Sequence, residues 1–213
     1  MVTDAPFPAW FFDRDDPSSD GGFYRAPRFV THIDDGAIRA VGELYADLGI
    51  DGAALQATTV LDLMSSWVSH FIMPPQQLTV LGMNRAELEA NEAAAERVVQ
   101  DLNVEASLPF DDDVFDAVTC CVSIDYLVQP VEVLAEVARV LKPGAPVVIT
   151  YSNRCFPTKA IHGWLATTDE QHGAVVSQYL ALAGGFAPPD VSLRTPTTRY
   201  RGDPLWAVVA RAI

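Results

Sequence analysis

The chain has 213 residues, 49% of them hydrophobic, so one core can bury most of its apolar surface and a single domain is expected. Its 28 acidic residues outnumber 14 basic ones, which leaves a formal net charge of −14, and the acidic residues are spread along the chain. Binding to nucleic acid or to an anionic membrane needs clustered Lys and Arg, so the composition argues against both partners and favours a small-molecule substrate.

The cysteines and the amino-terminal residues indicate the compartment. Cys120 and Cys121 are adjacent in an apolar run that predicts a strand, where neighbouring side chains point to opposite faces, so we expect no disulfide between them. Free thiols fit a reducing compartment. The amino-terminal residues lack the pattern of a secretory signal, and no apolar run is long enough to span a bilayer. These features predict a cytoplasmic protein.

The first 57 residues are predicted to form an arm and a helix. Residues 1 to about 23 are rich in Pro, Asp, Ser and Gly with aromatic residues between them, which predicts an irregular arm. An amphipathic helix is predicted to begin near Asp34 or Asp35 and to stop near Gly49. We expect residues 1–57 to be part of the same domain as residues 58–213.

From residue 58 the chain alternates apolar runs typical of strands with helical runs, which indicates a parallel sheet covered on both faces. The predicted strands are residues 59–63, 78–82, 115–122 and 146–151. A short segment lies near residues 67–73, and helices are predicted over residues 85–100 and 131–141. Asn84 and Glu87 resemble the capping box that starts a helix.

The last third departs from this alternation. A helix is predicted over residues 169–183, and it ends at a pair of glycines. The segments 191–200 and 204–213 then flank Arg-Gly-Asp, a turn that can close an antiparallel hairpin.

Three segments carry a family resemblance: "LTVLGMNRAELEAN", "VQDLNVEASLPFDDDVFDAVTCCVSIDYL" and "VEVLAEVARVLKPGAPVVIT". Together, over roughly residues 60–150, they resemble a class I S-adenosylmethionine-dependent methyltransferase. The most specific signal is an Asp followed by Leu-Pro-Phe, an acidic turn, Phe-Asp, a strand and then Arg-Val-Leu-Lys-Pro-Gly. A narrower likeness, which includes "DLMSSWVSH", resembles a subgroup from plants and bacteria with little assigned function.

The resemblance implies an α/β fold: a Rossmann-like, seven-stranded, mostly parallel sheet with an antiparallel C-terminal hairpin. It implies S-adenosyl-L-methionine as the cofactor, bound across the carboxyl ends of the first strands. Asp62 matches the acidic residue that closes the family's first strand, and Asn84 falls where an acidic residue usually meets the ribose. Asp101 matches the residue that accepts a hydrogen bond from the adenine amine, and the amide of Leu102 would face the ring.

The loop after the first predicted strand departs from the family because it lacks the usual glycines. It carries, in order, Met64, Ser65, Ser66, Trp67, Val68, Ser69 and His70. In one interpretation the serines offer hydroxyls and amides to the donor carboxylate while Trp67 packs over it. In the other, the serines cap a short helix and Trp67 belongs to the core.

Two further loops supply candidates for the acceptor side. "SIDYL" places Ser123, Asp125 and Tyr126 where the family commonly meets donor and acceptor. Asp125, with Tyr126, is a candidate catalytic residue that would act as a base or hold an acceptor amine. The alternative is that Asp125 caps the next helical turn and Tyr126 packs beneath it.

The loop "YSNRCFPTK" places Asn153, Arg154 and Lys159 near the same edge, where an Arg can bind a carboxylate or simply pair on the surface. Tyr24, Arg28 and His32 in the leader are further candidates to bind substrate, as a lid over the site. No histidine pair has metal-ligand spacing, so no metal site is expected.

The leading hypothesis is a methyltransferase that acts on a small molecule. A second hypothesis keeps the cofactor but not the reaction: the donor's own amino-acid portion cyclises and releases methylthioadenosine. A third is a non-catalytic relative that kept the fold.

Overall fold

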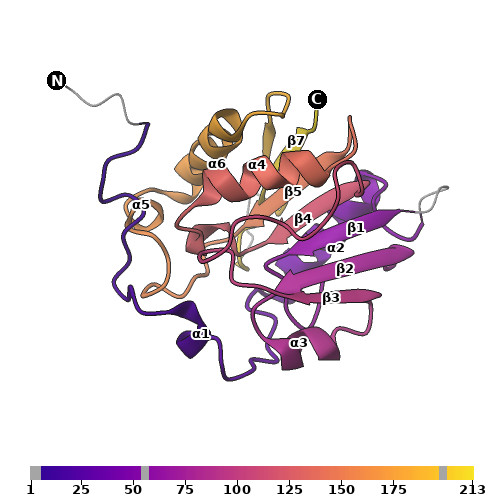
Figure 1. The fold of residues 1–213 in the computed structure, drawn as a ribbon, viewed down its shortest axis with the longest axis horizontal. Helices are drawn as coiled ribbons and strands as arrows, with labels where there is room; N and C mark the ends of the chain where they lie inside the picture. Colours follow the sequence, from indigo (N-terminus) through magenta and orange to yellow (C-terminus); the bar gives the residue numbers. More distant parts are fainter. Residues whose placement is uncertain (1–5, 54–57, 197–200) are drawn as a thin grey trace.

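A seven-stranded sheet forms the centre of the molecule in the computed structural model, which describes residues 6–53, 58–196 and 201–213 (Figure 1). The strands are β1 (Thr59–Leu63), β2 (Gln77–Gly82), β3 (Glu96–Val99), β4 (Ala117–Cys121), β5 (Pro146–Tyr151), β6 (Asp190–Leu193) and β7 (Trp206–Arg211). Their order is β3-β2-β1-β4-β5-β7-β6; the first five are parallel, and β7 runs antiparallel to β5 and β6. The predicted fold class is confirmed.

Burial explains which strands occupy the middle of the sheet. The side chains of β1, β2, β4 and β5 are almost all buried, as expected for parallel strands covered on both faces. The edge strands β3 and β6 are four residues each and largely exposed. Short edge strands offer few unpaired backbone groups to other chains.

Helices cover both faces of the sheet. They are α1 (Asp20–Phe23), α2 (Asp35–Asp47), α3 (Arg85–Ala90), α4 (Pro130–Val140), α5 (His162–Leu165) and α6 (Asp169–Ala183), with a 3-10 turn η1 (Ile124–Tyr126). The apolar residues of α4 and α6 pack in one core cluster and those of α2 in another, on the opposite side of the sheet (Figure 1). Phe11 of the amino-terminal arm is part of the first cluster. Among the described residues, no helix combines the length and apolar character needed to cross a membrane.

Several predicted elements are confirmed at their ends. The Asp34 side chain caps α2 by accepting a hydrogen bond from the Ala37 amide at 2.8 Å, and the chain turns at Gly49 with φ +66°. Helix α6 covers its predicted range, α4 begins and ends one residue before its predicted range, and β6 with β7 forms the antiparallel C-terminal pair. Residues 197–200 of the predicted hairpin lie outside the described residues.

The predicted helix over residues 85–100 is wrong beyond its first half. Helix α3 ends at Ala90, and Glu96–Val99 instead forms β3 beside β2. The Glu and Ala residues of this stretch favour a helix locally, but pairing with the exposed edge of β2 outweighs that preference. Asn91 fixes the break, because its side-chain amide donates to the Ser66 carbonyl and the Ser69 hydroxyl. No helix forms over residues 67–73 either.

Gly82 tests how closely the loop after β1 approaches β2. A Cβ at this position would lie 2.2 Å from the backbone oxygen of Ser65. We predict that Gly82→Ala lowers the free energy of unfolding by about 1–3 kcal/mol, because the backbone must move to relieve the overlap. Urea unfolding measures this. Gly22→Ala is the matched control, since a Cβ there has nothing within 4 Å; equal stabilities of the two variants would contradict the prediction.

Candidate functional site

A cavity of about 350 Å³ opens at the carboxyl edge of the parallel strands. Its walls come from the loops after β1, β2, β3, β4 and β5 and from leader residues between 20 and 32. Ligands of open parallel sheets bind at this edge, at the point where the strand order reverses. The volume lies within the range of about 300–1,000 Å³ that is usual for small-molecule sites.

The structure brings most of the predicted site residues together around this cavity. They are Asp62, Ser65, Ser66, Trp67, Asn84, Asp101, Leu102, Ser123, Tyr126, Tyr24, Arg28, His32 and Arg154. Asp125 and Asn153 are not among the lining residues. Sequence reasoning did not assign a site role to Asp20, Glu87, Asn103 or Phe156, which also line the cavity.

Asp62 anchors the loop that follows β1. Its carboxylate is 3% exposed and accepts hydrogen bonds from the hydroxyls of Ser65 at 2.6 Å and Thr119 at 2.8 Å. Burial raises the pKa of Asp62, and the hydroxyl donors oppose that rise. The next turn has φ +55° at Met64, a left-handed conformation that favours glycine. The loop therefore keeps a glycine-type turn without the glycine.

The serines of this loop bond to the protein itself. The Ser66 hydroxyl donates to Glu87 Oε2 at 2.6 Å, and the Ser69 hydroxyl accepts from Asn91 at 2.9 Å. Trp67 donates its ring N–H to the Val30 carbonyl at 3.0 Å and so ties the loop to the leader. The interpretation of a serine-capped short helix is wrong, because no helix forms here. Trp67 is half-buried at the cavity wall.

Asn84 caps α3 and also holds the leader. Its side-chain oxygen accepts from the Glu87 amide at 3.2 Å, which confirms the predicted cap. Its amide nitrogen donates to the carbonyls of Tyr24 at 2.8 Å and Arg25 at 3.2 Å. The Glu87 carboxylate does not complete a capping box; it accepts instead from the Arg28 amide at 2.6 Å. The predicted contact of Asn84 with ribose stays a prediction.

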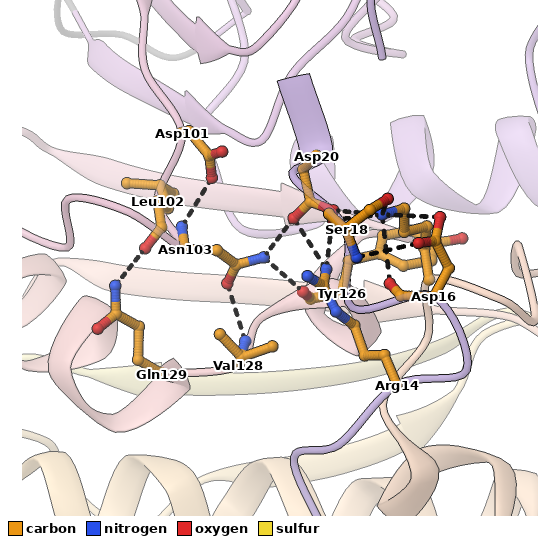
Figure 2. A network of polar contacts seen from close by, with 11 residues as sticks. Arg14, Asp16, Ser18, Asp20, Asp101, Leu102, Asn103, Tyr126, Val128 and Gln129 are labelled. Carbon is orange, nitrogen blue, oxygen red and sulfur yellow. Dashed lines mark hydrogen bonds and ion pairs between the residues drawn. The ribbon is translucent and has the colours of Figure 1, made fainter. Parts of the chain in front are cut away.

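The turn after β3 is fixed by a chain of hydrogen bonds (Figure 2). The Asp101 carboxylate accepts from the Asn103 amide at 3.0 Å, and the Leu102 carbonyl accepts from the Gln129 side chain at 2.7 Å. Asn103 donates to the Tyr126 carbonyl at 2.9 Å. Asp101 and Leu102, the predicted adenine contacts, are thereby held on the cavity wall beside the loop after β4.

A buried ion cluster joins the leader to this turn (Figure 2). Asp20, 4% exposed, accepts from Arg14 Nη1 at 2.8 and 2.9 Å and from Asn103 at 2.9 Å. Lys159 is fully buried and lies 3.1 Å from Asp20 and 3.0 Å from Asp16. Burial of Asp20 disfavours its charge, but the donors from Arg14, Asn103 and Lys159 outweigh it and hold its pKa below the ordinary value.

Asp125 lies behind the cavity wall. It is 3% exposed, its carboxylate atom Oδ2 has no hydrogen-bond partner among the described residues, and burial raises its pKa to about 8. Its predicted catalytic role is therefore not supported by exposure to the cavity and stays a prediction. Tyr126 does line the cavity, where its hydroxyl accepts from the Phe156 amide at 2.8 Å. The Ser123 hydroxyl donates to the Cys121 carbonyl at 2.8 Å.

Three other side chains that line the cavity are two neutral histidines and one arginine in an ion pair. Burial lowers the pKa of His32, and it lowers the pKa of His70 to about 4, so both imidazoles are neutral at pH 7. Arg154 is 63% exposed and pairs with Asp203 at 3.0 Å. That contact is the surface pairing that sequence reasoning held open for this residue.

Carboxylates outnumber cations around the cavity. Among the described lining residues the charged groups are Asp20, Asp62, Glu87 and Asp101 against Arg28 and Arg154. An acidic, partly desolvated cavity favours a ligand with positive charge, since attraction strengthens as water is excluded.

Comparison with known proteins defines the class. Residues 63–149 match a family described as Methyltransferase domain. The fold is shared with an S-adenosylmethionine-dependent methyltransferase from Aquifex aeolicus: TM-score 0.57, 14% identity, over 85% of this chain and 92% of that one. It is also shared with the 4+2 cyclase SpnF: TM-score 0.58, 17% identity, over 86% and 88% of the chains. Residues 63–149 therefore match a methyltransferase domain, and the chain shares its fold with an S-adenosylmethionine-dependent methyltransferase.

A curated relative is more similar in sequence over a shorter stretch. Demethylmenaquinone methyltransferase from Clavibacter sepedonicus is 34% identical over 112 residues, which are 52% of this chain and 43% of the relative. The match thus spans less than half of the relative's length.

The ion cluster predicts an effect of Asp20→Asn. At pH 7 the change leaves Lys159 and Arg14 with less compensating charge, so we expect a loss of about 2–4 kcal/mol in the free energy of unfolding. Because the pKa of Asp20 is lowered in the folded state, the wild-type advantage is present above the unfolded pKa and shrinks as pH falls below about 4. Thermal unfolding at several pH values measures this, with the exposed Asp13→Asn as control. A pH-independent difference would refute the charge argument.

Asp125→Asn predicts the opposite trend with pH. The folded carboxyl keeps its proton up to about pH 8, whereas an ordinary Asp ionises near 3.8. The wild type therefore loses stability as pH rises between these values, and Asn, which does not titrate, does not. We expect the variant to gain about 1–3 kcal/mol over the wild type between pH 5 and pH 8. Parallel pH profiles in chemical unfolding would show that Asp125 is ionised in the folded protein.

Proposed function

We propose that this chain is an S-adenosylmethionine-dependent methyltransferase whose acceptor is a small molecule. The observation that carries the proposal is the meeting of Asp62, Asp101 and Leu102 at one cavity at the carboxyl edge of the sheet. The sequence resemblance matches these residues to positions that hold the donor in the family. The curated relative's name supports a small-molecule acceptor.

The cofactor fits the chemistry of this cavity. When bound, it supplies an activated methyl group on a positively charged sulfonium, and the acidic lining complements that charge. Asp101 is held half-buried by its turn and keeps carboxylate oxygens toward the cavity, where one can accept a hydrogen bond from an adenine amine. Leu102 is buried beside it and offers an apolar surface to a ring.

The leader shapes the space left for the acceptor. Tyr24 and His32 form part of the cavity wall together with Phe156 from the loop after β5. The ring centroids of His32 and Phe156 lie 5.4 Å apart in a T-shaped arrangement. Covering the cavity excludes water and orients the acceptor, and orientation alone accounts for a large share of the rate of such transfers. His32 lines the cavity, and its neutral imidazole is able to accept a proton from an acceptor that must lose one.

Mass spectrometry of donor-derived products tests the proposal. Purified protein is incubated with S-adenosylmethionine alone and with a small-metabolite extract. We expect S-adenosylhomocysteine only when the extract is present. Release of methylthioadenosine from the donor alone would contradict methyl transfer and support the cyclising alternative. Donor that binds but stays unchanged in both incubations would support the non-catalytic alternative.

Asp101→Asn supplies the matched loss of function. Replacing a charged acceptor by an amide is expected to weaken donor binding about tenfold or more, since a hydrogen bond to a charged group contributes about 1.5–3 kcal/mol. Calorimetry with S-adenosylhomocysteine measures the affinity. Asp111→Asn, at an exposed position outside the cavity, is the control. Equal affinity of the two variants would contradict the proposed role of Asp101.

A further inference from the structure

We propose that Arg28 binds the carboxylate of the donor's amino-acid portion and so takes over a task that the glycine-free loop cannot perform with its hydroxyls. The proposal rests on the cofactor that the proposed function requires. In this proposal Arg28 binds the donor, whereas the sequence analysis made it a candidate to bind the acceptor.

The loop after β1 has committed its hydroxyl groups elsewhere. The Ser65 hydroxyl proton goes to Asp62 and that of Ser66 goes to Glu87, each at 2.6 Å. Short bonds to carboxylates are strong, so a ligand carboxylate would have to break them to recruit either hydroxyl. It would also approach two like charges. The loop side chains are thus poor partners for an anion.

Arg28 is held in place while one buried nitrogen of its guanidinium has no described hydrogen-bond partner. Its guanidinium packs over three aromatic rings, and its Cζ lies 4.5 Å from the ring centroid of Phe23, 5.4 Å from that of Phe156 and 5.6 Å from that of Tyr24. Nη2 donates to the Phe23 carbonyl at 2.9 Å. Nη1 is buried and has no hydrogen-bond partner among the described residues, although the side chain lines the cavity. A buried cationic donor without an acceptor is costly, which marks a place for a ligand oxygen.

Charge identifies the oxygen as that of an anion. Arg154, the other guanidinium of the described lining, is already paired with Asp203, whereas Arg28 makes no ion pair with a described carboxylate. The amine and sulfonium of the donor find carboxylates in the lining, and its carboxylate finds its counter-charge at Arg28.

The leader backbone places this cation next to the loop. The Arg28 amide donates to Glu87 Oε1 at 2.6 Å, while Glu87 Oε2 accepts from Ser66. A single carboxylate therefore joins Arg28 to the loop that contacts the amino-acid portion of the donor in relatives. The bridge fixes the backbone of Arg28 beside the loop after β1.

The test compares two ligands that differ by the amino-acid portion. Calorimetry measures the affinities of S-adenosylhomocysteine, which carries the carboxylate, and methylthioadenosine, which lacks it. Wild type, Arg28→Gln and Arg28→Lys are compared, with Arg25→Gln as the control because Arg25 is an exposed leader arginine outside the cavity lining. Thermal unfolding verifies that each variant is folded.

We expect Arg28→Gln to weaken S-adenosylhomocysteine about 10–100-fold and methylthioadenosine less than about threefold, and Arg28→Lys to recover part of the loss. An unchanged ratio of the two affinities, whether neither ligand or both are weakened, overturns the proposal, and an acceptor anion then becomes the occupant of Nη1. Absence of binding to the wild type would instead refute the cofactor assignment. Bound S-adenosylhomocysteine without methyl transfer would refute the proposed function alone.

Discussion

The buried ion cluster around Asp20 is the interaction on which the site depends. The leader has little regular structure, so ordering it costs conformational entropy. Packing of a few aromatic rings and specific polar bonds must offset that cost. Lys159, fully buried, and Arg14 neutralise Asp20, while Asn103 joins it to the turn after β3. A buried charge left without these partners would be unstable, so the cluster allows one position of the leader. The outer wall of the cavity follows from that position.

The glycine-free loop makes a left-handed turn and holds it with side-chain hydrogen bonds. Met64 adopts a left-handed φ, which stores strain that surrounding bonds must hold. Asp62, Glu87 and Asn91 supply those bonds from below and from the side. Because the hydroxyls of the loop are occupied with its own support, we propose that the leader recognises the donor's amino-acid portion.

Features set by local sequence signals could be predicted, whereas features set by contacts between residues far apart in the chain could not. The long apolar runs and strand-end positions are local signals, and a parallel sheet brings strand ends to one edge whatever the loops do. The strand β3 was missed because its pairing with β2, not its own composition, makes it a strand. Asp20 was missed because its partner Asn103 lies 83 residues away. Asp125 was expected at the site, but the tight turn η1 directs it into the core.

The fold alone does not decide the reaction, since a cyclase and a methyltransferase share it. The charge of the cavity gives a more specific argument. Methyl transfer removes the sulfonium charge, so on the proposed function an acidic lining attracts the donor more strongly than its product. A carboxylate anchor at Arg28 acts equally on both, because the carboxylate is unchanged by the reaction. On the proposed function, the acidic residues would therefore favour the donor over its product, and Arg28 would hold the carboxylate of either one.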